Sequence, residues 1–188
     1  INASEPFRLL LVHLEQEIFQ NQEVPGMDLE GKLLPYAIQV DQWTGGGLQQ
    51  LFEQVKQCIL RVDGAISPQN MRWIQKMLTE EIPSWKHQIG ELVYQARMNV
   101  INSQLRMNIA SLAMKALQTQ GYQIEQAGYE DDDMRGEYQV QMVDLDGSRI
   151  VIKVDPKPGA AVDSELHVFV TDLAKRTPHE IRQRAGEL

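Results

Sequence analysis

The sequence predicts an α+β protein in which N-terminal helices lead, through one long helix, into a small antiparallel sheet. Two observations support this prediction. Apolar residues recur at helical spacing over residues 84–120, a stretch that contains no proline. Beyond Gly121, apolar and polar residues alternate, which is typical of half-buried strands. We therefore expect a helical region over 1–83, a long connecting helix over 84–120, and a sheet domain with a short terminal helix over 121–188.

The first helix is expected to begin at Ser4 and to end near Asn21. Ser4 is a residue that favours the helix cap, Pro6 suits the first turn, and the apolar residues that follow are spaced by three, four and seven. Residues 23–46 contain several prolines and glycines. Residues 32–42 are compatible with a short helix or an extended run, but because the prolines and glycines interrupt regular structure, we expect a loop with at most one helical turn.

Two further helices are expected before the long one. Leu48 to Val62 is strongly amphipathic and is followed by a glycine, and another helix should begin at Ser67 and run up to Pro83. Proline lacks the N–H of an internal helical residue. We therefore expect a turn or kink at Pro83, with Ser84 capping the long helix.

Apolar side chains form a stripe along the long helix that shifts slightly after Ala96. The stripe consists of Trp85, Ile89, Leu92, Val93 and Ala96, followed by Ile101, Leu105, Ile109, Leu112, Ala116 and Leu117. About 37 residues at ~1.5 Å each span roughly 55 Å, which is longer than a compact domain of half this size. We therefore expect this helix either to bridge two domains or to pair with another chain.

Four strands are expected in the C-terminal part, over residues 122–128, 137–145, 149–154 and 165–171. The pair Asp146-Gly147 between the second and third strands predicts a tight hairpin. A capping box with proline in the first turn predicts that a short helix begins at Thr177.

Composition favours a soluble, intracellular protein. The chain is 43% hydrophobic and 23% charged, and its one cysteine excludes an intramolecular disulfide. No apolar run approaches the roughly 20 residues of a membrane helix, so we expect a cytoplasmic protein without membrane contact. Because the chain begins with Ile1 rather than methionine, we expect the native start to be missing.

Charge separates between the long helix and the sheet. Residues 84–120 carry four basic side chains and one acidic, a net charge of +3, whereas 122–172 carry a net charge of −8. An acidic surface repels the phosphate backbone. Only the long helix could therefore face nucleic acid, through Lys86, Arg97, Arg106 and Lys115.

The run from Glu130 to Asp133 places four adjacent carboxylates in the loop before the hairpin. Adjacent carboxylates repel one another unless a cation neutralises them. We rank a solvated loop first, a docking surface for a basic partner second, and a metal site third. A linear run offers Mg²⁺ or Ca²⁺ few converging oxygens unless Asp144 or Asp146 folds alongside.

Other motifs are incomplete. Asp144 to Gly147 lacks the later ligands of a calcium loop, and a hairpin turn explains it. A sheet-borne nuclease site would need an acid two residues before Lys153, but position 151 is Val151. The glycines at 45–47 precede a helix, where phosphate can bind, but lack the lysine of a P-loop, so a hinge is preferred.

These patterns favour a non-enzymatic protein–protein interaction or assembly module, either oligomeric or part of a larger protein, that binds a protein partner or a second copy of itself. The expected partner-binding residues are Glu130, Asp131, Asp132, Asp133, Leu92, Ala96, Ile101, Leu105 and Ile109. A nucleic-acid-associated accessory protein that uses the long helix ranks second, and a magnesium-dependent enzyme that uses the acidic loop ranks third. No catalytic residue, cofactor or bound metal is expected.

Overall fold

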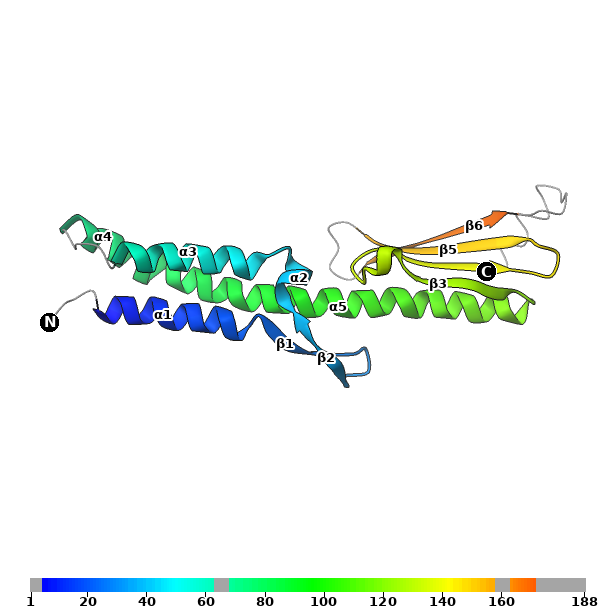
Figure 1. Ribbon diagram of the computed structural model, residues 1–188, viewed down its shortest axis with the longest axis horizontal. Coiled ribbons are helices and arrows are strands. Elements are labelled where there is room, and N and C mark those ends of the chain that lie inside the picture. The colour runs from blue at the N-terminus through cyan, green and yellow to red at the C-terminus, as the bar shows by residue number, and fades with distance from the viewer. Residues whose placement is uncertain (1–4, 63–67, 158–162, 172–188) are drawn as a thin grey trace. The chain divides into compact units, whose positions relative to one another are not determined.

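The computed structural model describes residues 5–62, 68–157 and 163–171 and confirms the α+β fold class (Figure 1). Its helices and turns are α1 (Glu5–Gln20), α2 (Val40–Thr44), α3 (Gly47–Val62), α4 (Pro68–Lys76), the π-helical turn η1 (Met77–Glu81), α5 (Ile82–Thr119) and the 3-10 turn η2 (Glu130–Asp132). Its strands are β1 (Glu23–Met27), β2 (Leu33–Gln39), β3 (Gln123–Tyr129), β4 (Tyr138–Val143), β5 (Arg149–Pro156) and β6 (Ser164–Thr171). The terminal helix predicted from Thr177 lies outside the described residues.

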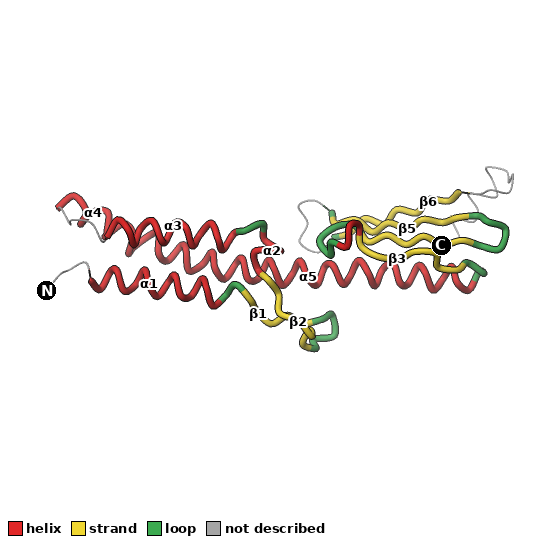
Figure 2. The backbone as a smooth tube through the Cα atoms, in the orientation of Figure 1, coloured by secondary structure: helices red, strands yellow, loops and turns green. Residues whose placement is uncertain are grey.

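The chain forms two compact units, and α5 contributes to both. The first unit comprises Ile1–Met27 and Lys32–Arg97, and the second comprises Asp28–Gly31 and Met98–Leu188. Helices dominate the first unit, whereas the second combines the end of α5 with the four-stranded sheet (Figure 2).

The core of the first unit is formed by apolar faces of α1, α3 and the beginning of α5, which lie side by side (Figure 1). Each face repeats at the three- and four-residue spacing of an amphipathic helix. The buried side chains are Phe7, Leu11, Leu14 and Ile18 of α1, Leu48, Leu51, Val55 and Val62 of α3, and Ile82, Trp85, Ile89, Val93 and Ala96 of α5.

The expectation of a loop over residues 23–46 is wrong, because this segment forms the β1–β2 hairpin and α2. Proline is compatible with a two-stranded sheet, in which every strand is an edge strand. The register shifts between Pro25 and Met27, so Pro25 and Gly26 mark an irregularity rather than a break. A Cβ at Gly26 would lie 2.5 Å from Ile38 Cδ1, so the missing side chain permits the burial of Ile38.

The glycine run before α3 acts as a turn, and a carboxylate already occupies the helix N-terminus. Gly45 and Gly46 adopt φ of 68° and 82°, which glycine tolerates without steric cost. Asp41 Oδ1 accepts a hydrogen bond from Leu48 N at 2.7 Å, and its Oδ2 accepts one from Gln49 N at 3.1 Å. These backbone amides are therefore engaged by the chain's own acid, which argues against the phosphate site that was the alternative to the expected hinge.

The prediction of a turn at Pro83, with Ser84 as a new helix cap, is also wrong, since helix continues from α4 through η1 into α5. An internal proline loses one hydrogen bond and clashes with the carbonyl four residues earlier. Here the π-helical turn η1 ends at Glu81, two residues before Pro83. The wider turn that precedes the proline accommodates it within a continuous helix. Ser84 is an internal helical residue whose Oγ accepts a hydrogen bond from Gln88 Nε2 at 3.2 Å.

The sheet of the second unit is antiparallel in the order β3-β4-β5-β6. Alternate residues on β4 and β5 are buried with Ala110, Leu117 and Tyr122, and they define the inner face of the sheet. These residues are Tyr138, Val140, Met142, Ile150, Ile152 and Val154. The hairpin predicted at Asp146-Gly147 is confirmed: Asp144 N donates to Ser148 O at 3.0 Å, and Gly147 has φ of 81°.

The buried stripe of α5 does not shift as predicted. It continues at the same three- and four-residue spacing through Val100, Ser103, Arg106, Ala110 and Leu117. The predicted stripe followed the apolar residues through Leu112, which is 68% exposed, to Leu117, which is buried as expected. Helical geometry therefore places a serine and an arginine in the interior, where composition alone does not predict them.

We expect the Asp41→Ala substitution to lower the free energy of unfolding of the first unit by about 1 kcal/mol, because it removes the acceptor for two N-terminal amides of α3. Urea unfolding followed by tryptophan fluorescence tests this prediction, since Trp43, Trp73 and Trp85 all lie in this unit. Glu53→Ala on the exposed surface of α3 is the control and should change the value by less than about 0.5 kcal/mol. Equal effects of the two substitutions would contradict a capping role.

Candidate interaction surface

The outer face of the second unit's sheet is predominantly polar. Its side chains alternate with the buried ones of the inner face, and they are half-buried or exposed. On β4 and β5 they are Gln139, Gln141, Val143, Arg149, Val151, Lys153 and Asp155. This face and the adjoining edge strand β6 carry the candidate functional groups of the unit.

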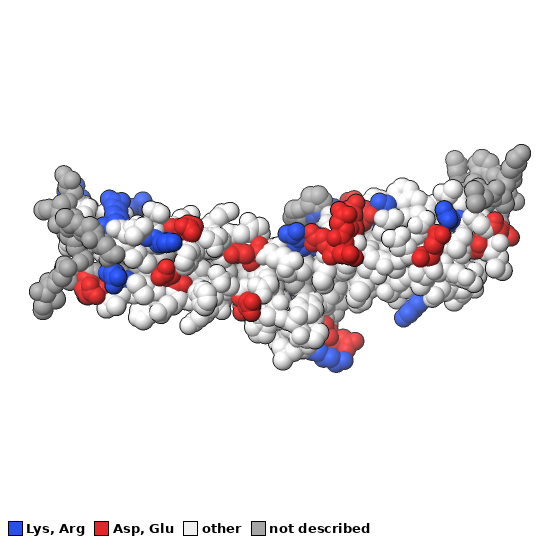
Figure 3. All heavy atoms as spheres, viewed as in Figure 1, with Lys and Arg blue, Asp and Glu red and all other residues white. Residues whose placement is uncertain are grey.

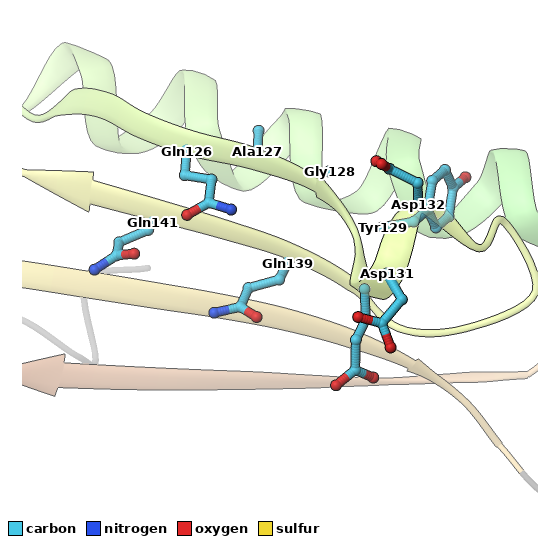
Figure 4. Close-up of a pocket in the computed structure, with 9 residues that line it drawn as sticks. Gln126, Ala127, Gly128, Tyr129, Asp131, Asp132, Gln139 and Gln141 are labelled. Atoms are coloured by element: carbon cyan, nitrogen blue, oxygen red, sulfur yellow. The ribbon is translucent and has the colours of Figure 1, made fainter.

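A hollow of about 280 Å³ lies between the outer face at β3 and β4 and the turn η2 (Figure 4). In the register, Gly128 lies opposite Gln139, and Gln126 lies opposite Gln141. A Cβ at Gly128 would meet no atom within 4 Å, so the missing side chain leaves space beside Gln139. Three glutamine side chains and the acidic residues of η2 give the hollow a polar lining.

The predicted acidic run forms a tight loop at the rim of this hollow. Glu130 N donates to Glu137 O at 3.0 Å, and Asp133 N donates to Glu130 O at 3.0 Å. Asp131 and Asp132 have φ of 53° and 58°, in the left-handed region that residues with a Cβ rarely adopt. Figure 3 shows acidic side chains gathered over this part of the second unit.

One of the four carboxylates is engaged within the loop. Arg135 Nη2 donates to Asp133 Oδ2 at 2.7 Å, and Arg135 Nε donates to Oδ1 at 2.9 Å. The Arg135 backbone N also donates to Oδ1 at 3.0 Å. These hydrogen bonds, those of the arginine side chain above all, lower the pKa of Asp133 to about 2. The side chains of Glu130, Asp131 and Asp132 are exposed.

A buried arginine on α5 holds the other side of the loop. Arg106 is 3% exposed, and its Nη2 donates to Met134 O at 3.0 Å and to Arg135 O at 3.3 Å. Burial lowers the pKa of its guanidinium group. The sequence interpretation assigned Arg106 to a basic stripe facing phosphate, and its burial contradicts that assignment.

A second polar contact fixes the residue that precedes the loop. Ser103 Oγ, fully buried on α5, donates to Tyr129 Oη at 2.8 Å, and Tyr129 Oη donates to Ser103 O at 2.8 Å. The ring of Tyr129 packs edge-on against Tyr138, with centroids 4.8 Å apart. The loop thus leaves β3 from an anchored position. Sequence reasoning missed Ser103 and Tyr129; the helical spacing of Ser103 from Ala96 and Ala110 was the available signal.

Some of the charged side chains at the next part of the outer face are paired. Lys153 Nζ lies 2.7 Å from Glu137 Oε1, and this hydrogen bond raises the pKa of Lys153. His167 Nε2 on β6 lies 3.5 Å from Asp155 Oδ2 and 3.6 Å from Glu165 Oε2. Burial, followed by a hydrogen bond with Glu137, raises the pKa of Asp155. Position 151 supplies no acid for a nuclease motif, and Lys153 pairs instead with Glu137, the residue that precedes β4.

Strand β6 leaves apolar side chains exposed at the edge of the sheet. Leu166 and Val168 lie opposite the buried residues Val154 and Ile152 on the inner face, yet they are 50% and 36% exposed. Phe169, on the outer face opposite Val151, is 52% exposed. Within the described part of the chain, no strand pairs with the far side of β6.

The predicted partner-binding residues of the long helix lie largely against the chain itself. Ala96 is fully buried in the first unit, and Ile109 packs against the core of the sheet. A Cβ at Gly47 would collide with Leu92 Cδ2, so α3 approaches α5 closely there. Ile101 and Leu105 are half-buried. The structure does not bring this stripe together with Glu130, Asp131, Asp132 and Asp133 in one described site.

Among residues 5–62, 68–157 and 163–171, no three histidine, cysteine, aspartate or glutamate side chains converge in an arrangement that could hold a metal ion. The helices in those ranges also lack the combination of length and apolar character needed to cross a membrane. Compared with models of protein families, with curated proteins and with solved structures, the chain matches none.

We expect the Asp133 carboxylate to titrate with a midpoint near pH 2 in the folded chain, whereas the ordinary value is about 3.9. Because its pKa is depressed on folding, its contact with Arg135 stabilises the loop fully above about pH 4, and this stabilisation is lost as the pH falls through about 2. Carboxyl ¹³C NMR measures the midpoint. Arg135→Ala should return it towards 3.9, and Arg149→Ala, which removes the distant contact with Glu125, should leave it unchanged. A midpoint unaffected by Arg135→Ala would refute this assignment.

Proposed function

We propose that this chain is a non-enzymatic protein–protein interaction or assembly module that binds its partner through the edge strand β6. The observation that carries the proposal is the exposure of Leu166, Val168 and Phe169 on a strand whose far side is unpaired among the described residues. An edge strand offers backbone N–H and C=O groups as a template for a further strand. Apolar side chains on both faces would add burial to those hydrogen bonds.

The two edges of the sheet differ in a way that supports β6 as the contact. Strand β3 has a register irregularity between Ile124 and Gln126, and it carries two glutamines, a glutamate and a glycine. Bulges and polar side chains are devices that prevent unwanted pairing at a sheet edge. Strand β6 pairs with β5 over eight consecutive residues with no register shift, so its backbone is regular throughout.

The acidic loop and its hollow supply a second element of the proposal. The exposed carboxylates of Glu130, Asp131 and Asp132, beside the amides of Gln139 and Gln141, would accept basic or amide groups and would repel an acidic surface that approaches over the outer face, so an acidic partner would be restricted to the β6 edge. Such charges mainly affect selectivity and the rate of association. The apolar strand would contribute most of the affinity.

The two alternative functions receive less support from the geometry. Arg106, one of four basic residues assigned to a phosphate-facing helix, is buried and bonded to backbone carbonyls. Asp144, proposed as an additional magnesium ligand, accepts hydrogen bonds from Asp146 N and Ser148 N within the hairpin turn. Asp133 is engaged by Arg135.

The test is affinity capture of the tagged chain's partners from the cells that produce it, quantified by mass spectrometry. Val168→Lys places a charge on the β6 edge and should reduce the captured partner, whether a copy or another protein, at least tenfold. Ile124→Lys is the matched control, because Ile124 is 46% exposed at the opposite edge of the same sheet. It should leave capture within twofold of the wild type. If both substitutions reduce capture equally, or neither does, the proposal fails.

A further inference from the structure

We infer that the partner of β6 is a second copy of this chain, whose β6 pairs antiparallel with the first about a two-fold axis at Val168. This inference rests on the function proposed above and specifies its partner and register. The pairing would join two four-stranded sheets into one of eight strands. Isologous contacts of this kind are the commonest form of protein self-association, because one surface serves both partners.

The distribution of charge over the sheet region supports the choice of a second copy. The sheet region over residues 122–172 carries a net charge of −8, so two copies repel one another over most of this surface. Strand β6 contains a single carboxylate, Glu165, and a single imidazole, His167, among apolar and hydroxyl side chains. It is therefore a nearly neutral strip within an acidic unit, and another copy can approach there without opposing a row of like charges.

The pattern of faces restricts the register. Side chains opposite each other in an antiparallel pair project to the same face. If both copies keep their inner faces on one side, Leu166, Val168 and Val170 of one copy must lie opposite inner-face residues of the other. Only registers in which a residue of β6 faces its own counterpart satisfy this condition.

Among these registers, the one centred on Val168 matches the central side chains well. It places Val168 opposite Val168 and Leu166 opposite Val170, so apolar groups meet on the inner face. On the outer face, Phe169 lies opposite the imidazole of His167, with which it already stacks at 6.4 Å within one chain. Glu165 then lies opposite Thr171, and no carboxylate faces another.

A register centred on His167 is less favourable. It places the two imidazoles opposite each other, so they repel when protonated, and it places Glu165 opposite the apolar ring of Phe169. The cost of like charges opposite each other in a sheet is comparable to the gain from a good cross-strand pair. The axis at Val168 avoids both mismatches.

Cysteine cross-linking of the full chain tests the register. In a Cys58→Ser background, which removes the single native cysteine, Val168→Cys should form a disulfide-linked dimer under mild oxidation. Directly opposed Cβ atoms in an antiparallel pair lie about 4.5–5.5 Å apart, close enough for a disulfide after small adjustment. Leu166→Cys alone should cross-link at least tenfold more slowly, whereas an equal mixture of the Leu166→Cys and Val170→Cys chains should cross-link efficiently.

The matched control is Ile124→Cys, which places a thiol at the opposite edge with similar exposure. Cross-linking of Val168→Cys no faster than this control would overturn the inference, and equal rates for Val168→Cys and Leu166→Cys would overturn the register. Hydrogen exchange of the unmodified chain provides an independent readout. Amides of β6 should become at least tenfold more protected as concentration rises through the dimerisation range, while those of β3 should not change.

Sedimentation separates failure of this inference from failure of the proposed function. A wild-type chain that remains monomeric at high concentration, yet loses a different captured protein on Val168→Lys, would overturn self-pairing and leave the interaction function standing. A monomer whose captured proteins are unaffected by Val168→Lys would overturn both. A dimer dissociated by Val168→Lys but not by Ile124→Lys would support both.

Discussion

The second unit depends on the burial of its sheet's inner face against one face of α5. Ala110 and Leu117 of the helix are fully buried together with Val140, Met142 and Ile152 of the central strands. This burial is the main favourable contribution to the unit's stability, and it fixes the register of the sheet because a one-residue slip would expose every inner side chain. A single helix covers a limited width of sheet, however. The inner-face side chains of β4 and β5 are enclosed, whereas Leu166 and Val168 on β6 are left exposed by the same arrangement. The apolar edge is thus a direct consequence of how the core is built.

Polar contacts within that interface position the outer loop. Arg106 donates to two backbone carbonyls of the loop, and Ser103 exchanges hydrogen bonds with Tyr129 at the end of β3. A buried guanidinium group loses its hydration, so breaking its contacts would leave a desolvated charge and an unanchored loop. The loop can therefore hold Asp131 and Asp132 in left-handed backbone conformations, because contacts on both sides determine its path. These contacts therefore fix the backbone conformation of the acidic rim of the hollow.

The sequence predicted those parts of the fold in which local pattern and tertiary packing agree. The strands and the Asp146-Gly147 hairpin followed from alternation and turn chemistry, and the long helix followed from its period. The predictions failed where a residue's usual preference was overridden by its surroundings. Pro25 and Gly26 were read as breakers, but one lies in an edge strand and the other makes room for Ile38. Arg106 was assigned to a phosphate-facing stripe because it is charged, and Ser103 was not identified at all, although their spacing from Ala96 and Ala110 places both in the buried stripe. The hollow and the exposed edge depend on how strands and helix align in space, and local sequence patterns contain no direct signal for them.

The edge strands β3 and β6 differ in regularity and in apolar character, and together with the net negative charge this difference affects where the sheet can associate. Residues 122–172 carry a net charge of −8, and their internal ion pairs, such as Lys153 with Glu137, leave carboxylates in excess. Repulsion between such surfaces opposes nonspecific association of two copies, and the polar, irregular strand β3 offers a poor template for pairing. These features leave β6 as the edge where a regular backbone and apolar side chains coincide. Specificity then arises from exclusion elsewhere as much as from attraction at β6, since a second copy that docks at β3, the other edge of this sheet, meets a broken register.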